Sequence, residues 1–163
     1  MIKYMDDQII SINSFEELLL KLQEIFDTVE PGDLKDLLFF LQDFKTEHPQ
    51  IEECTISIEE LPLEGMEVSE NKISTVLVEG ITKYIELHYQ KNSLPPVVIL
   101  RGNIREMILH GEMNAVEGYV RKMPVKSIIF DFGDQDIFEK FKIDPTRVVF
   151  LIPVIQRNLM KNT

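Results

Sequence analysis

The sequence predicts a single-domain α/β protein, built on a sheet of about five mostly parallel strands with helices on its faces. Its 163 residues are a typical length for one domain. Hydrophobic residues make up 44% and charged residues 28%, as in ordinary globular proteins. In the last third of the chain, unbroken apolar runs alternate with helical patterns, which is typical of parallel strands joined by crossovers. An α+β arrangement is the alternative.

The first fifty residues predict a short strand followed by two helices. The strand covers residues 8–12. Ser14 and Glu17 have the spacing of a capping box, in which each side chain accepts a hydrogen bond from a free amide at the start of a helix. Pro31 begins the second helix. That helix ends before Pro49, because the residue that precedes a proline is pushed out of helical geometry.

Residues 53–59 alternate between apolar and polar side chains, which predicts a strand with one buried face. The buried face carries Cys54, Ile56 and Ile58. Glu59 belongs to the other face, which we expect to meet solvent. A long helix is then predicted over residues 71–90 from its apolar spacing. The portion 1–70 therefore has the predicted order strand, helix, helix, strand.

Three continuous apolar runs predict strands that are buried on both faces: residues 97–100, 127–130 and 148–152. A helix is predicted between the first two runs, over residues 104–123, with a break at Gly111. A shorter helix is predicted between the second and third runs, over residues 135–142. The portion 96–155 therefore alternates strand and helix, which is the reason for expecting parallel strands.

Negative charge is concentrated in the first part of the chain, although the whole carries a net charge of −11. Residues 1–70 hold 18 acidic residues against 4 lysines, whereas residues 71–163 hold 10 acidic residues against 13 basic ones. Such a one-sided field can steer a basic protein partner. The predicted contact residues lie opposite the apolar stripes of the two helices: Glu16, Glu17, Glu24, Asp27, Asp36 and Asp43. A solvated surface that keeps the protein soluble is the simpler interpretation.

The sequence predicts a cytoplasmic protein. Asp6 and Asp7 stand where the apolar region of a secretory signal would begin. The longest apolar run, residues 148–155, is too short to cross a bilayer. A single cysteine, Cys54, forms no internal disulfide and suits a reducing compartment. The negative charge disfavours direct nucleic-acid binding, but acidic helices can also imitate a phosphate backbone, and this possibility stays open.

Polar side chains follow two of the predicted buried strands, and they define an alternative site. Arg101 and Asn103 follow one strand, and Asp131 and Asp134 follow another. Ligands of an open parallel sheet bind beyond the carboxyl ends of its strands, and carboxylates are typical ligands of Mg²⁺. The alternative function is therefore a small metal-dependent hydrolase or a ligand-binding protein that uses this group. Helix capping by Asn103 and Asp134 is the simpler interpretation.

The chain contains no glycine-rich nucleotide motif and no serine nucleophile elbow, so no cofactor is predicted. The three histidines are far apart in the sequence, and no metal site is predicted from them.

The order of elements over residues 8–101 resembles that of barstar-type ribonuclease inhibitors, chiefly in the stretches 12–18 and 33–38. The Tyr-Gly pair and the tryptophan of that family's second helix are missing. The resemblance implies an acidic inhibitor. Together these features favour a non-enzymatic interaction module, such as an inhibitor, an immunity-like protein or a regulator, over an enzyme.

Overall fold

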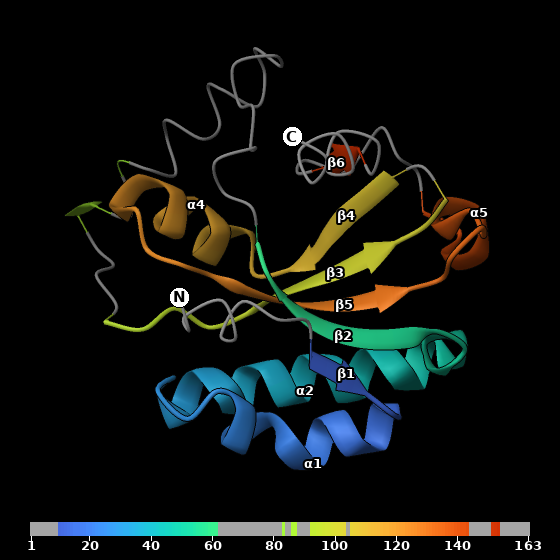
Figure 1. Ribbon diagram of the computed structural model, residues 1–163, viewed down its shortest axis with the longest axis horizontal. Coiled ribbons are helices and arrows are strands. Elements are labelled where there is room, and N and C mark those ends of the chain that lie inside the picture. The colour runs from blue at the N-terminus through green and yellow to red at the C-terminus, as the bar shows by residue number, and fades with distance from the viewer. Residues whose placement is uncertain are drawn as a thin grey trace, which may run out of the picture.

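A computed structural model describes residues 10–61, 83, 86–87, 92–103, 105–143 and 151–153. Its described part forms one sheet with helices on both faces (Figure 1). The elements are, in chain order, β1 (Ile10–Ile12), α1 (Phe15–Ile25), α2 (Pro31–Glu47), the 3-10 helix η2 (Pro49–Glu52), β2 (Thr55–Glu60), β3 (Val97–Arg101), β4 (Arg105–His110), α4 (Glu112–Arg121), β5 (Lys126–Asp131), α5 (Ile137–Phe141) and β6 (Leu151–Pro153). None of the described helices is long and apolar enough to cross a membrane.

The described residues form a mixed sheet of six strands in the order β1-β2-β5-β3-β4-β6. Among the described strands, β3 and β5 form the one parallel pair, and every other neighbouring pair is antiparallel. The α/β or α+β class is therefore confirmed, but the prediction of a mostly parallel sheet is wrong.

The main reason for this difference lies at residues 105–110, which form the strand β4 and not the first half of a helix. β4 folds back on β3 as an antiparallel hairpin, with Arg101 opposite Glu106. Gly102 and Asn103 suit a tight turn as well as a helix start, so the local sequence does not separate the two outcomes. The predicted helix survives as α4, from Glu112 onward. β6 then pairs antiparallel with β4 and does not extend a parallel sheet.

The other predicted helix limits agree closely with the structure. At the start of α1, Ser14 Oγ accepts a hydrogen bond from the amide of Glu17 at 3.0 Å, and the Glu17 carboxylate accepts one from the amide of Asn13 at 3.3 Å. α2 begins at Pro31 and ends before Pro49, as expected. α5 is shorter than predicted, and Asp136 caps it in place of Asp134. The predicted helix over residues 71–90 lies outside the described residues, apart from positions 83, 86 and 87, which are helical.

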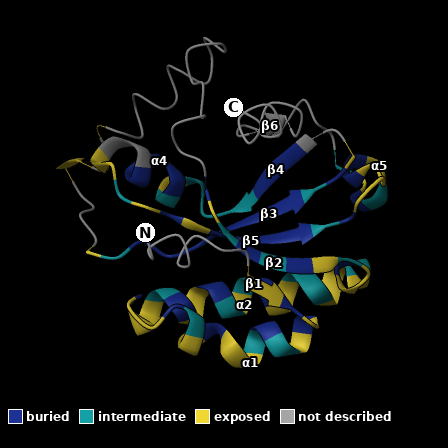
Figure 2. Cartoon of the chain, in the orientation of Figure 1, coloured by how far each residue is buried: buried dark blue, intermediate teal, exposed yellow. Residues whose placement is uncertain are grey.

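The central strands β3 and β5 are buried on both faces, as their apolar runs predict (Figure 2). Val98, Leu100, Ile128 and Phe130 pack against the layer that α1 and α2 form below the sheet. Phe130 stacks on Phe15 of α1, with 5.8 Å between the ring centroids. The opposite face packs against α4 through a second cluster that includes Val97, Ile99, Ile129 and Ala115. The two helices α1 and α2 therefore have one buried side and one outer side.

The turn after β3 is tightly packed at Gly102. A Cβ atom added there would lie 2.8 Å from the Gln135 carbonyl oxygen and 3.1 Å from a methyl carbon of Ile137. We expect Gly102→Ala to lower the free energy of unfolding by about 1–3 kcal/mol, because backbone must move to admit the methyl group. Gly32→Ala is the matched control, since nothing lies within 4 Å of its Cβ position. Urea denaturation of both variants measures the effect, and equal stability of the two would contradict it.

Candidate functional site

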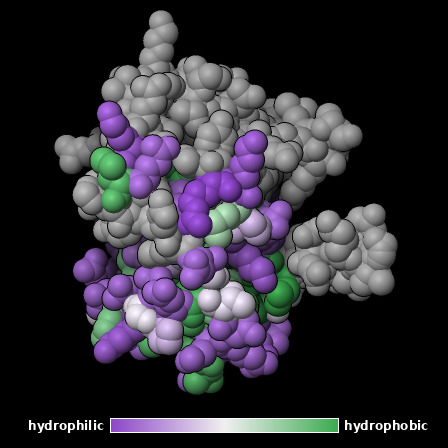
Figure 3. All heavy atoms as spheres, turned by 90° about the vertical axis from the view of Figure 1, so that its left-hand side faces the viewer, coloured by the Kyte–Doolittle hydropathy of each residue, from purple (hydrophilic) through white to green (hydrophobic). Residues whose placement is uncertain are grey.

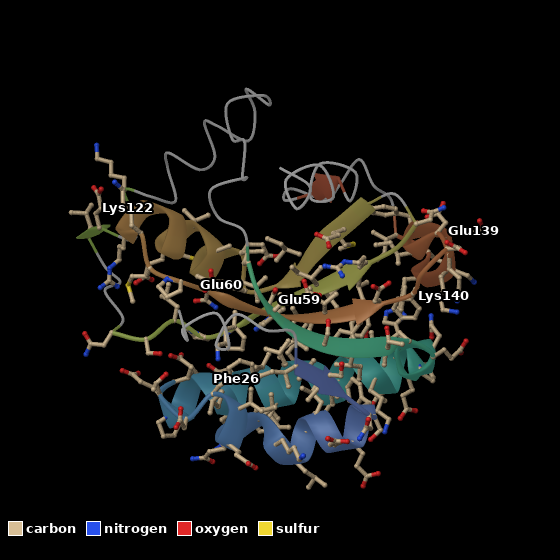
Figure 4. The ribbon with its side chains drawn as sticks, viewed as in Figure 1. Phe26, Glu59, Glu60, Lys122, Glu139 and Lys140 are labelled. Atoms are coloured by element: carbon tan, nitrogen blue, oxygen red, sulfur yellow. The ribbon has the colours of Figure 1, made fainter. Side chains whose placement is uncertain are left out.

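Arg101 lies at the centre of a cluster that joins four neighbouring strands. Its Nε lies 2.5 Å from a carboxylate oxygen of Glu106 on β4. Its guanidinium also contacts Glu59 on β2 at 3.3 Å and Asp131 on β5 at 3.4 Å. Glu59 is labelled on β2 in Figure 4. The alternation along β3 places Arg101 on the same side as Val97 and Ile99, which is the face away from α1 and α2. The four residues Arg101, Glu59, Glu106 and Asp131 are called the Arg101 cluster below.

The Arg101 cluster is largely withdrawn from solvent. The side chains of Arg101, Glu59 and Glu106 are 12%, 10% and 0% exposed, whereas that of Asp131 is 30% exposed. Burial by itself would lower the pKa of Arg101, but the charges and hydrogen bonds of Glu106 and Glu59 outweigh it and raise the pKa above its usual value. The guanidinium therefore stays charged, and it occupies the place between the carboxylates that a bound cation would take.

The predicted strand-end group is only partly brought together. Asp131 contacts Arg101 and also accepts a hydrogen bond from the amide of Gly133 at 2.8 Å. Asn103 and Asp134 are exposed and lie in the turns that follow the two strands. Those turns meet through backbone, since the amide of Asn103 donates to the Gln135 carbonyl at 3.0 Å. Within the described ranges, no group of three or more His, Cys, Asp or Glu side chains is arranged to hold a metal ion.

Sequence reasoning missed Glu59 and Glu106 as members of this cluster. The alternating pattern of residues 53–59 predicted that Glu59 faces solvent. Residues 104–123 were predicted as a helix, so no strand pairing was expected for Glu106. In the structure, Arg101 lies directly opposite Glu106 on β4 and beside Asp131 on β5. A charged residue that ends a buried apolar strand was the available signal, because such a residue needs a partner of opposite charge.

Five of the predicted acidic residues lie on α1 or α2, and the sixth, Asp27, lies in the turn between the two helices. Glu16, Glu24 and Asp36 are exposed, and Glu17 is partly exposed. The remaining two, Asp27 and Asp43, are also exposed. We call the six together the acidic helical surface. In Figure 3 the lower part of the molecule, which contains this layer, is mostly hydrophilic with isolated hydrophobic side chains.

The acidic helical surface keeps most of its charge. Glu17 forms an ion pair with Lys21 at 3.2 Å. For the other five residues, the described part of the chain supplies no ion pair. Residues 15–47 contain nine acidic residues and three lysines. The layer is therefore strongly negative toward solvent, on the side of the molecule opposite the Arg101 cluster.

His110 of β4 packs against α2. Its ring stacks on Phe40 of α2 with 4.3 Å between the centroids. Burial lowers the pKa of His110 below its usual 6.5, although the negative charges of Glu112 and Asp36 act in the opposite direction. The imidazole is therefore held neutral as a packing residue at ordinary pH.

Cys54 has the properties of a structural thiol. Its Sγ–H donates to the Ile51 carbonyl at 3.1 Å. Burial and the nearby Asp131 carboxylate raise the pKa of the thiol to about 12. A thiol that resists ionisation is a poor nucleophile.

Comparison with protein-family models, with curated proteins and with solved structures gives no significant match for this chain. The similarity in element order to barstar-type inhibitors therefore assigns no family. The fold and the two charged regions define a mixed α/β protein with a compensated ion cluster on one side of its sheet and an acidic helical layer on the other.

We expect Arg101→Met to lower the free energy of unfolding by about 3 kcal/mol or more at pH 7, because it leaves three neighbouring carboxylates without their shared cation. Lys21→Met is the control. It removes an exposed pair and should cost less than about 1 kcal/mol. Urea denaturation at pH 7 measures both variants, and a loss for Arg101→Met no larger than that for Lys21→Met would contradict the prediction.

The stability of the folded protein should depend on pH through His110. Because the pKa of His110 is lower in the folded protein than in the unfolded chain, the unfolded chain binds a proton more readily. The contribution of His110 to stability is therefore complete above about pH 6.5 and is lost as the pH falls from there toward the lowered pKa. We expect the wild-type protein to lose more stability between pH 7.5 and 5.5 than His110→Gln does. Parallel loss in the two proteins, measured by urea denaturation, would contradict this.

Proposed function

We propose that this protein is a non-enzymatic interaction module whose acidic helical surface binds a basic surface on another protein, as an inhibitor, an immunity-like protein or a regulator does. One observation carries the proposal: five of the six acidic residues are exposed on a single helical layer and have no ion pair within the described residues. Negative charge that is gathered on one side of a molecule accelerates encounter with a positive partner.

The outer side of α1 and α2 is suited to this role because folding does not use it. The apolar stripes of both helices, including Leu18, Leu22, Leu37 and Leu41, are buried against the sheet. The outward residues can therefore be exchanged at small cost to the core, and they are free to serve recognition.

A metal-dependent hydrolase or ligand-binding protein that uses Arg101, Asn103, Asp131 and Asp134 is less well supported. The central guanidinium neutralises part of the carboxylate charge that would attract a cation. Asn103 and Asp134 are exposed and lie in the turns that follow β3 and β5. A buried ion cluster that fixes strand register is a sufficient reason for these contacts.

We expect the combined variant E16Q/E24Q/D36N/D43N to lose most of its association rate for the natural partner, by about tenfold or more at low salt. The partner is to be captured from native cells at 50 and 300 mM KCl with the immobilised full chain, and the rate measured by biolayer interferometry. The matched control E53Q/E60Q/D134N/E139Q removes the same number of charges from exposed positions outside the acidic helical surface. It should retain both the rate and its steep salt dependence.

Equal capture and equal rates for the two charge variants would count against the proposal, because position on the helical layer would then be irrelevant. A captured partner whose binding does not weaken with salt would also count against the proposal, because exposed charges are screened over about 10 Å at 0.1 M ionic strength.

A further inference from the structure

Two large apolar side chains stand out on the outer side of the helical layer. Leu20 of α1 is 79% exposed and Phe39 of α2 is 54% exposed. Each lies two residues from two buried leucines of its own helix: Leu18 and Leu22 for Leu20, and Leu37 and Leu41 for Phe39. Two residues correspond to about 200° around an α-helix, so each exposed side chain lies opposite the buried stripe.

Both side chains consequently point to the same side of the molecule. The buried leucines of α1 and α2 belong to one core cluster beneath one face of the sheet, and the two helices lie side by side there (Figure 1). Residues opposite those leucines therefore face away from the sheet on both helices. Phe39 and Leu20 share the outer side of the layer with the acidic helical surface.

Each apolar side chain is flanked by two exposed carboxylates along its helix. Glu16 and Glu24 lie four residues before and after Leu20. Asp36 and Asp43 lie three residues before and four residues after Phe39. Residues three or four apart are neighbours on a helix surface, so each apolar group has an acidic group above and below it.

The ring of Phe39 already attracts a cation, since Lys35 Nζ lies 5.9 Å from its centroid. The face of an aromatic ring is electronegative and favours a lysine or arginine from any source. The surface thus offers two apolar contacts bordered by four carboxylates and, at Phe39, by the single cation of Lys35. Its chemical complement is an apolar stripe with basic borders. A second copy of this chain is disfavoured as the occupant, because its own acidic residues would meet these at close range.

We infer that Leu20 and Phe39 are the apolar anchors of the acidic helical surface, and that the partner presents to them an amphipathic basic helix with an apolar stripe between lysines and arginines. The inference rests on the proposed function and adds a division of roles to it. The carboxylates set the rate of association, which salt screens, whereas burial of Leu20 and Phe39 slows dissociation, which salt affects little.

The test uses two synthetic 18-residue helical peptides of equal positive charge, one with a leucine stripe between lysines and one with serine in place of each leucine. Binding to the full chain is measured by fluorescence anisotropy at 50 and 300 mM KCl. We expect the leucine peptide to bind more tightly than the serine peptide. L20Q and F39Q should each raise its Kd about tenfold or more at both salt concentrations. M113Q is the control, because Met113 is 38% exposed on α4, on the other side of the sheet.

Gln suits a helix nearly as well as the residues it replaces, and all three sites are exposed, so unchanged urea melts should accompany these results. The inference is overturned if the leucine peptide does not bind, if both peptides bind equally, or if L20Q and F39Q behave like M113Q. If binding weakens in E16Q/E24Q/D36N/D43N but not in L20Q or F39Q, the anchoring role of Leu20 and Phe39 is overturned. The proposed function of the acidic helical surface would then still stand. Sedimentation velocity that shows a wild-type dimer abolished by L20Q and F39Q would identify a second copy as the occupant and also overturn the inference.

Discussion

The structure depends on the burial of β3 and β5 on both faces. Their apolar residues are 0% exposed at Val97–Leu100 and at Ile128–Phe130. Strands of this kind need a covering layer on each side, because each face would otherwise expose a continuous apolar surface. α1 and α2 cover one face and α4 covers the other. This requirement orients the two acidic helices: their leucines must point to the sheet, so their carboxylates must point to solvent.

Charge is handled differently on the two sides of the sheet. On the α4 side, Arg101 gathers Glu59, Glu106 and Asp131 in a cluster with little access to water. Buried ion pairs of this kind add little net stability, but the loss of one partner strongly lowers the free energy of unfolding. They therefore favour one register of strand pairing over its alternatives. On the α1 and α2 side, the carboxylates lie in water, where they cost little and create a long-range field. The first arrangement serves folding, and the second is available for binding.

Local patterns succeeded where the outcome depends on neighbours in the chain. The Ser14 and Glu17 cap, the limits of α2, and the doubly buried strands β3 and β5 all follow from spacing, proline positions or apolar runs. Local patterns failed at residues 105–110, which were predicted as a helix but form the strand β4. Because a helix was expected there, the sheet was wrongly predicted to be mostly parallel. Turn residues such as Gly102 and Asn103 permit either a hairpin or a helix start, and pairing with β3 decides between them.

By itself, the sequence determined the class of the fold, the strands that must be buried and the exposure of the acidic residues on α1 and α2. These depend on hydrophobic periodicity, which is a property of consecutive residues. Only the tertiary structure decided the antiparallel path of β4, the assembly of the Arg101 cluster, and the common outer side of Leu20 and Phe39. Each of these brings together residues from separate elements, and their meeting depends on how sheet and helices pack, which no local pattern specifies.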